Sequence, residues 1–108
     1  MNENVGEYKK LVRDGIPRII EDDGLRPIIR RLTDDEYESE LYKKLAEETA
    51  EVAESDGSLE ELVDVMEVVR AICKAKGYRI QDVEDARTLK RQKRGGFDEK
   101  VFLERIAE

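Results

Sequence analysis

Hydrophobic residues recur at intervals of three and four positions over two long segments in the middle of the chain. The first segment runs from about Asp34 to Glu54, and the second runs from about Ser58 to Lys76. This spacing matches the period of an α-helix, so each segment predicts an amphipathic helix. The residues between them, Ser55-Asp56-Gly57, are typical of a tight turn. The pattern therefore predicts an antiparallel helical hairpin.

Both predicted helices begin with the same capping motif. Thr33-Asp34-Asp35-Glu36 opens the first helix, and Ser58-Leu59-Glu60-Glu61 opens the second. In a capping box the hydroxyl and the carboxylate each accept a hydrogen bond from a backbone amide that the helix leaves unpaired. Gly77 follows the second helix, at a position that glycine favours.

The first thirty residues are less regular. Pro17 suits the first turn of a short helix that carries Ile19 and Ile20, and Pro27 opens an extended stretch. We expect this stretch, around Ile28, to pair with a short strand near the other end of the chain.

The last third of the chain contains a predicted helix and an apolar tail. The helix runs from Ile80 to Arg94 and is ended by Gly95-Gly96. The tail from Phe97 to Leu103 is the expected partner strand.

The fold class that these elements predict is all-α. The 108 residues suit one domain that spans positions 1–108. A helical hairpin and one further helix make a thin core, so we expect a four-helix-bundle-type core to form on oligomerisation, as a homodimer or homotetramer.

Composition restricts the chemistry that the chain can perform. Charged residues make up 44% of the sequence, against roughly 25% in typical globular proteins. The absence of histidine excludes Ser-His-Asp triads, Cys-His pairs and histidine-ligated zinc. The single cysteine excludes an intramolecular disulfide. Catalysis would have to depend on carboxylates, Lys, Arg, Tyr or a metal.

The charge is unevenly distributed along the chain. The net charge is −7, but residues 34–67 hold fourteen acids and two bases, while residues 70–94 carry a net +6. The sequence starts without the apolar stretch of a signal peptide, and no apolar run reaches the roughly 20 residues that span a bilayer. We therefore expect a cytoplasmic protein that does not bind membranes, and the acidic block makes a nucleic-acid polymer an unfavourable partner.

Carboxylates interrupt the apolar faces of both hairpin helices. On a helical wheel of the second helix Glu61 lies between two apolar arcs, of roughly 20° to 160° and 280° to 340°, and Asp64 lies within the second arc. The first arc holds Leu59, Leu62, Val65, Met66, Val69, Ile72 and Cys73, and the second holds Val68, Ala71 and Ala75. On the first helix Glu48 lies roughly 40° from the centre of the apolar stripe, with Glu51 one turn further on.

Four carboxylates on facing helices would repel one another unless a cation joined them. We therefore predict that Glu48, Glu51, Glu61 and Asp64 bind Mg²⁺, with Mn²⁺ as the alternative, because hard divalent ions prefer oxygen ligands. The competing interpretation of Glu61 is a purely structural role in the second capping box. Solvent exposure accounts for three further acids of these helices: Glu47, Glu60 and Glu67.

The helix at 80–94 carries a basic ridge, formed by Arg87, Lys90, Arg91 and Arg94 within roughly 100° of arc. Beside a metal site, such a ridge would hold a phosphate-bearing substrate. The alternative is a solvated helix end, where the helix dipole favours basic residues.

Three motifs resemble those of one enzyme superfamily. Glu47-Glu48-Thr49-Ala50-Glu51 followed by Glu61-Leu62-Val63-Asp64 resembles the EExxE and ExxD signature of the all-α nucleoside triphosphate pyrophosphohydrolases, the MazG-like and phosphoribosyl-ATP pyrophosphohydrolase superfamily. Residues 8–17 and 94–97 resemble segments common in its small stand-alone members.

The resemblance implies Mg²⁺-dependent hydrolysis between the α and β phosphates of a nucleotide, with release of a monophosphate and pyrophosphate. It assigns the metal to the four carboxylates chosen above and an outer-shell or base role to Glu47. It also implies that Lys44 and the ridge residues Arg87, Lys90 and Arg94 hold the phosphates. The short connection between Glu51 and Glu61 leaves the nucleotide base open.

Two alternatives to this house-cleaning activity remain open. One is the phosphoribosyl-ATP pyrophosphohydrolase step of histidine biosynthesis. The other is a non-catalytic helical adaptor whose acidic block binds a basic partner.

Overall fold

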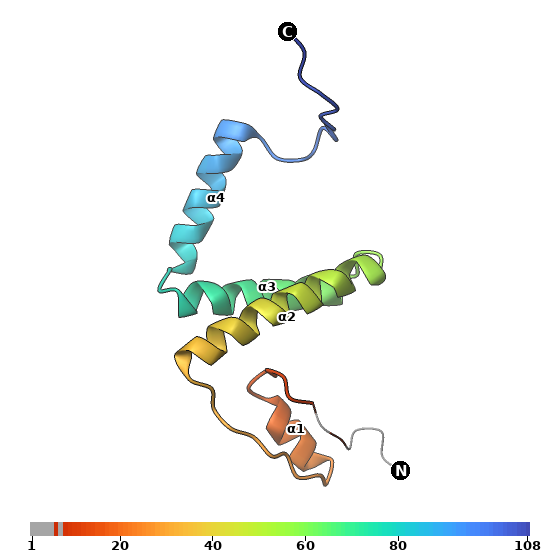
Figure 1. Ribbon diagram of the computed structural model, residues 1–108, viewed down its shortest axis with the longest axis vertical. Helices are drawn as coiled ribbons and strands as arrows, with labels where there is room; N and C mark the ends of the chain where they lie inside the picture. Colours follow the sequence, from red (N-terminus) through yellow and green to blue (C-terminus); the bar gives the residue numbers. More distant parts are fainter. Residues whose placement is uncertain (1–5, 7) are drawn as a thin grey trace.

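The protein is all-helical, as predicted. The computed structural model describes residue 6 and residues 8–108, and over that range it contains four helices and no strand (Figure 1). They are α1 (Ile16–Asp22), α2 (Asp34–Glu54), α3 (Leu59–Ala75) and α4 (Ile80–Arg94). The sequence therefore predicted the limits of the three long helices to within about a residue.

The start of α2 has a complete capping box. The Thr33 hydroxyl accepts a hydrogen bond from the Glu36 amide at 3.3 Å, and the Glu36 carboxylate accepts one from the Thr33 amide at 3.1 Å. Arg30 donates two further hydrogen bonds to the same carboxylate, at 2.9 and 3.2 Å. The pairing with Arg30, together with the Thr33 amide, lowers the pKa of Glu36 to about 2.

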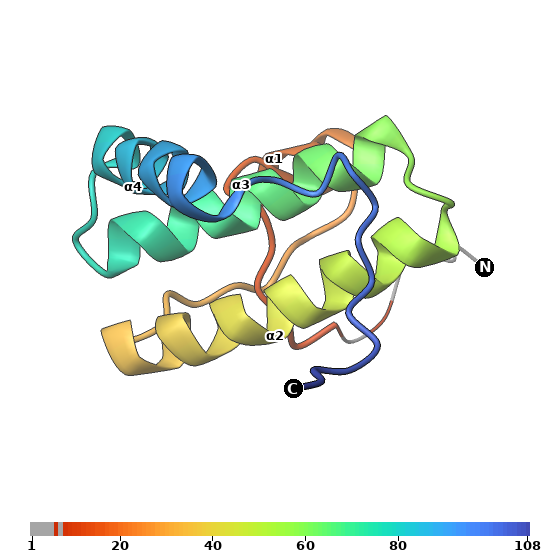
Figure 2. The ribbon, with the colours of Figure 1, turned by 90° about the horizontal axis from the view of Figure 1, so that it is seen from above.

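A tight turn joins α2 to α3 and makes them antiparallel. Asp56 and Gly57 both have positive φ, at 57° and 74°, a conformation that glycine adopts without steric cost. The Gly57 amide donates to the carbonyl of Val52 at 2.8 Å, which closes the end of α2. The two helices then lie side by side (Figure 2). Leu41 of α2 and Val68 and Cys73 of α3 are the buried hydrophobic residues of the described chain.

Helix α4 departs from the far end of this hairpin. It contacts α3 but not α2, and none of its residues is buried (Figure 1). One chain therefore forms a helical hairpin with an extended arm, and a four-helix-bundle core stays a prediction for an assembly.

The predicted pairing of the tail with the segment around Ile28 is wrong. Residues 97–108 contain no strand, and the side chains of Phe97 and Ile28 are 98% and 87% exposed. Figure 1 shows why: α4 carries the tail to the opposite end of the molecule from the segment that follows α1. No helix within the described residues has the length and apolar character needed to cross a membrane.

Candidate metal centre

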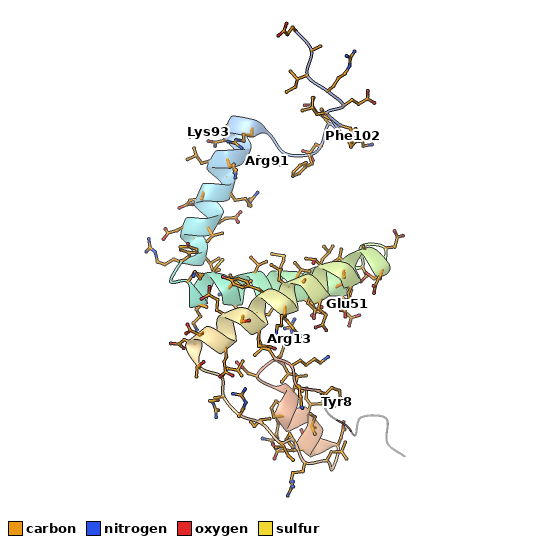
Figure 3. All side chains as sticks on the ribbon, viewed as in Figure 1. Tyr8, Arg13, Glu51, Arg91, Lys93 and Phe102 are labelled. Atoms are coloured by element: carbon orange, nitrogen blue, oxygen red, sulfur yellow. The ribbon has the colours of Figure 1, made fainter. Side chains whose placement is uncertain are left out.

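Three carboxylates converge where the two hairpin helices face each other. Helix α2 supplies Glu48 and Glu51, which are one turn apart, and α3 supplies Glu61. One carboxylate oxygen from each residue lies within 4.8 Å of the other two. We call these three residues the acidic cluster. Figure 3 shows the position of Glu51 on the hairpin, near the connection between α2 and α3.

Glu48 is the buried member of the acidic cluster. Only 8% of the residue is exposed, and its Oε2 atom has no hydrogen-bond partner within the described part of the chain. Burial raises the pKa of Glu48, and the neighbouring carboxylates of Glu51 and Asp64 raise it further. Lys44 opposes this shift with its ammonium group 3.7 Å from the Glu48 carboxylate. Glu48 is thus a buried acid whose negative charge is incompletely compensated.

The second capping box, on which the structural interpretation of Glu61 depends, is incomplete. The Ser58 hydroxyl does accept a hydrogen bond from the Glu61 amide, at 3.3 Å. The Ser58 amide, however, donates to the hydroxyl of Ser55 at 3.2 Å rather than to the Glu61 carboxylate. The carboxylate is thereby free of the helix end. Its buried Oε2 atom has no hydrogen-bond partner among the residues described.

Asp64, the fourth expected ligand, is engaged by a cation of the protein itself. Its Oδ1 atom accepts a hydrogen bond from Arg13 at 2.7 Å. Asp64 still lies close enough to Glu48 to influence the pKa of that residue. No sequence motif assigned a role to Arg13, although this residue belongs to the N-terminal segment that carried part of the family resemblance. A pairing between positions 51 residues apart leaves no signal in local periodicity.

Two lysines contact the outer acid Glu47. Its carboxylate lies 3.9 Å from the ammonium group of Lys10 and 3.7 Å from that of Lys44. Lys44, expected to bind phosphate, is therefore already placed between two carboxylates, with 18% of its side chain exposed.

The charges of this region leave room for a divalent cation. The acidic cluster together with Glu47 and Asp64 supplies five carboxylates, against the three cations of Lys10, Arg13 and Lys44. The remaining two negative charges equal the charge of one divalent ion. An all-oxygen donor set with two unpartnered buried oxygens fits Mg²⁺.

The prediction that the basic ridge lies beside the acidic cluster is wrong within one chain. Glu61 is near the start of α3, whereas α4 begins beyond its end, roughly 20 Å away along the helix. Figure 3 shows Arg91 and Lys93 far from Glu51. The helix-period pattern locates residues around one helix, but it does not say in which direction the next helix leaves.

The ridge residues divide into paired and unpaired side chains. Arg87 pairs with Glu84 on its own helix, and Arg91 pairs with Asp98 at 2.9 Å, with its guanidinium against Gly96. Lys90 and Arg94 are exposed and have no ion-pair partner within residues 8–108. These two cations are the ones available to an external anion.

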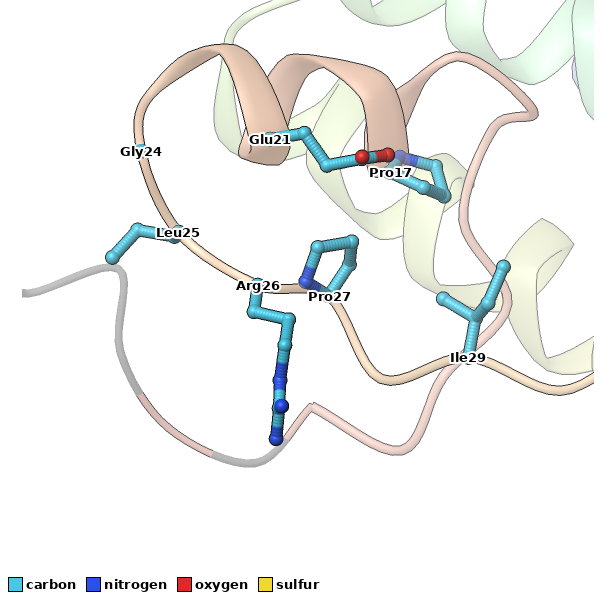
Figure 4. Close-up of a pocket in the computed structure, with 7 residues that line it drawn as sticks. All are labelled: Pro17, Glu21, Gly24, Leu25, Arg26, Pro27 and Ile29. Carbon is cyan, nitrogen blue, oxygen red and sulfur yellow. The ribbon is translucent and has the colours of Figure 1, made fainter.

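A separate surface hollow of about 450 Å³ lies beside α1 (Figure 4). Its lining residues are Pro17, Glu21, Gly24, Leu25, Arg26, Pro27 and Ile29. None of the predicted site residues borders it, so it is not part of the candidate metal centre.

Comparison with known proteins gives one partial match. The chain is 51% identical over 47 residues to an uncharacterised protein of Mycolicibacterium smegmatis, an alignment that covers 44% of this chain and 48% of that protein. The chain thus spans about half the length of that relative. No family model and no solved structure matches the chain.

Proposed function

We propose that the chain is a Mg²⁺-dependent nucleotide pyrophosphohydrolase that cleaves between the α and β phosphates and releases a nucleoside monophosphate and pyrophosphate. The observation that carries this proposal is Glu48, a buried carboxylate with an unpartnered oxygen that faces Glu51 and Glu61. Nothing in the hairpin compensates such a group fully, and burial of an uncompensated charge is costly. A bound cation would remove that cost.

The chemistry of the candidate ligands supports the choice of cation. Carboxylate oxygens alone favour Mg²⁺ or Mn²⁺ over softer metals, and the acidic cluster contains neither histidine nor cysteine. Glu48, Glu51 and Glu61 would hold the ion, and Asp64 would join them once it separates from Arg13. When bound, the ion supplies neutralisation of phosphate charge and a lower pKa for a water molecule.

The reaction requires only water as co-reactant. The water oxygen bonds to phosphorus, the bond from phosphorus to the bridging oxygen breaks, and the pyrophosphate leaves with the electron pair of that bond. A carboxylate must accept the proton of the attacking water. Glu47 is the candidate for this role, because 41% of its side chain is exposed and two lysines hold it at the edge of the acidic cluster.

In this proposal Arg13 can bind either Asp64 or a phosphate group of the substrate. It neutralises Asp64 in the present structure, and a guanidinium released from Asp64 is suited to bind a phosphate group through two parallel hydrogen bonds. Its side chain is 53% exposed, so a substrate on the hairpin surface would reach it.

The histidine-biosynthesis substrate and the non-catalytic adaptor remain the competing proposals. The adaptor would use the same carboxylates to bind a basic partner, without metal. A nucleotide panel that includes phosphoribosyl-ATP, assayed for pyrophosphate release with and without Mg²⁺, separates all three.

The decisive variant is Glu48→Gln. We expect it to lower the rate of pyrophosphate release by about 100-fold or more, because it removes a metal ligand. We expect Mg²⁺ to raise the melting temperature of the wild type, and the variant should abolish this rise. Without metal, the variant should melt a few degrees higher than the wild type, because it no longer buries a charge next to Glu51.

The pH dependence of stability provides a further check on Glu48. Because the folded state raises its pKa, the folded chain holds a proton that the unfolded chain has already released. The metal-free wild type should therefore lose stability as pH rises from about 4.5 through the raised pKa, and Glu48→Gln should reduce this loss. Glu54→Gln, an exposed substitution on the same helix, is the matched control. Full activity and an unchanged Mg²⁺ response in Glu48→Gln would exclude the proposed site.

A further inference from the structure

The segment that precedes α1 places two cations beside the acidic cluster. Residues 10–13 form no helix or strand, and Arg13 lies against the hairpin (Figure 3). Arg13 donates a hydrogen bond to Asp64 of α3 at 2.7 Å, and the ammonium group of Lys10 lies 3.9 Å from the Glu47 carboxylate of α2. We call residues 10–13 the cationic segment. It therefore contacts both hairpin helices, and in each case through an acid that flanks the acidic cluster.

Arg13 and a metal ion would compete for the same carboxylate. Asp64 is close enough to Glu48 for its charge to raise the pKa of that residue, so it lies within reach of the metal as a further ligand. Its Oδ1 atom is already engaged by the guanidinium group of Arg13. A divalent ion bound to Asp64 would repel that guanidinium group and weaken the pair.

The two cations of the cationic segment are also the accessible ones. The side chains of Lys10 and Arg13 are 46% and 53% exposed, whereas that of Lys44 is 18% exposed. The basic ridge of α4, to which the family resemblance assigned the phosphates, begins beyond the far end of α3. Within one chain, the cationic segment is therefore better placed than the ridge to meet an anion at the acidic cluster.

The balance of charge predicts when an anion can bind there. Without metal, the three cations of the region face five carboxylates, so the region has a net charge of about −2 and repels an anion. A divalent ion would bring this charge to about zero and would weaken the hold of Asp64 on Arg13. The guanidinium group would then be able to bind a phosphate group through two parallel hydrogen bonds.

We infer that the cationic segment is the phosphate-binding side of this site, and that Arg13 exchanges Asp64 for a phosphate group when Mg²⁺ binds. Mg²⁺ and the phosphate group would therefore bind cooperatively, and each would strengthen the binding of the other by the same factor. That the phosphate group belongs to a nucleotide rests on the proposed function.

Titration with Mg²⁺ alone tests the first half of the exchange. Arg13→Gln should bind Mg²⁺ about tenfold more tightly than the wild type, because Asp64 no longer has to leave a partner. Calorimetry measures this gain, which damage to the site would not produce. Arg18→Gln is the matched control, since Arg18 pairs with Asp22 on α1, and it should leave the affinity within about twofold. Unchanged or weaker Mg²⁺ binding in Arg13→Gln would overturn the exchange.

A double variant separates the exchange from a general effect of charge. Arg13→Gln removes a positive charge from the region as well as the partner of Asp64. If Arg13 acts through Asp64, adding Arg13→Gln to Asp64→Asn should change the Mg²⁺ affinity by less than about twofold. A tightening of about tenfold that persists in the Asp64→Asn background would be a charge effect and would overturn the exchange.

Titration with inorganic phosphate, followed by phosphorus NMR, tests the second half. The wild type should bind phosphate about tenfold more tightly with saturating Mg²⁺ than without it. Asp64→Asn should bind phosphate without Mg²⁺ more tightly than the metal-free wild type, because it releases Arg13. With Mg²⁺ present, Arg13→Gln and Lys10→Gln should each weaken phosphate binding. Equal wild-type affinities with and without Mg²⁺, or no gain in Asp64→Asn, would overturn the coupling.

The ridge provides the control for the position of the phosphate site. Lys90→Ala combined with Arg94→Ala should leave the affinity for inorganic phosphate within about twofold of the wild type, because these cations lie away from the acidic cluster. A loss in this variant together with unchanged binding in Arg13→Gln would place the phosphate site on the ridge and overturn the inference.

These titrations need no turnover, so failure of the exchange and failure of the proposed function are distinguishable. A wild type that hydrolyses no nucleotide of the panel, but gives the expected gains in Arg13→Gln and Asp64→Asn, would remove the proposed function and leave a metal-linked phosphate site. Mg²⁺-dependent release of pyrophosphate without a gain in Mg²⁺ affinity in Arg13→Gln would keep the function and overturn the exchange.

Discussion

The two hairpin helices begin with equivalent motifs whose carboxylates have different roles. At the start of α2 the carboxylate of Glu36 returns to the amide of Thr33 and completes the capping box. At the start of α3 the carboxylate of Glu61 does not return to Ser58, and it lies instead with Glu48 and Glu51. The same sequence signature thus gives a structural acid at one helix and a candidate metal ligand at the other.

The difference arises from residues outside both motifs. Arg30 precedes the first motif and holds Glu36 at the helix end with two hydrogen bonds. Ser55 precedes the second motif, and its hydroxyl accepts the hydrogen bond from the Ser58 amide that Glu61 would otherwise receive. A capping box therefore identifies a helix start, while the neighbouring groups decide whether its carboxylate remains available.

The largest expected contrast is between substitutions of the two motif carboxylates. Glu61→Gln should reduce pyrophosphate release by about 100-fold or more and remove the stabilisation by Mg²⁺, because it deletes a ligand. Glu36→Gln should leave both within twofold of the wild type, since glutamine also completes a capping box. Steady-state rates and thermal melts with and without Mg²⁺ measure the contrast. Equal losses in the two variants would show that the motifs do not differ in function.

A smaller effect is expected from Ser55→Ala. This change leaves the Ser58 amide without its acceptor, so the Glu61 carboxylate should turn back to complete the capping box. Mg²⁺ affinity should fall by about tenfold, which corresponds to about 1.4 kcal/mol, the size of one hydrogen bond to a charged group. Calorimetric titration with Mg²⁺ measures the change, and Ser39→Ala, at an exposed position of α2, is the control. Unchanged affinity in Ser55→Ala would mean that this hydroxyl does not position Glu61.

The smallest effect concerns the stability that Glu36 contributes. Its folded-state pKa is about 2, below its usual value near 4.5, so the unfolded chain takes up a proton first as pH falls. The contribution of Glu36 to stability is therefore complete above about pH 4.5, and it is lost as the pH falls towards 2. Glu36→Gln should flatten this part of the stability profile by no more than a few degrees in melting temperature, because the pair is exposed. Thermal melts from pH 2 to pH 7 test it, and an unaltered profile would contradict the assignment.

Much of the fold was accessible from the sequence because it depends on local interactions. The period of the apolar residues and the capping motifs gave the limits of α2, α3 and α4, and the three-residue turn gave the hairpin. The predicted strand in the tail was wrong because a strand needs a partner nearby. Whether the tail and the segment around Ile28 lie close together depends on the direction of α4 after Gly77, and neither segment encodes that direction.

The candidate site was predicted in part. The helical wheel placed Glu48, Glu51 and Glu61 on facing surfaces, and the structure brings these three together. The helical wheel could not show that Arg13 donates a hydrogen bond to Asp64, since the two residues are 51 positions apart. That the three residues bind a metal stays a prediction.

By itself the sequence determined an all-helical chain and the faces on which its carboxylates lie, since helix period and end-capping act over three or four residues. The tertiary structure alone decided that Glu61 joins the acidic cluster, that Arg13 neutralises Asp64, and that the basic ridge lies away from both. Those outcomes depend on which groups compete for one hydrogen bond or charge across the fold. The local periodicity of the sequence does not predict the outcome of that competition.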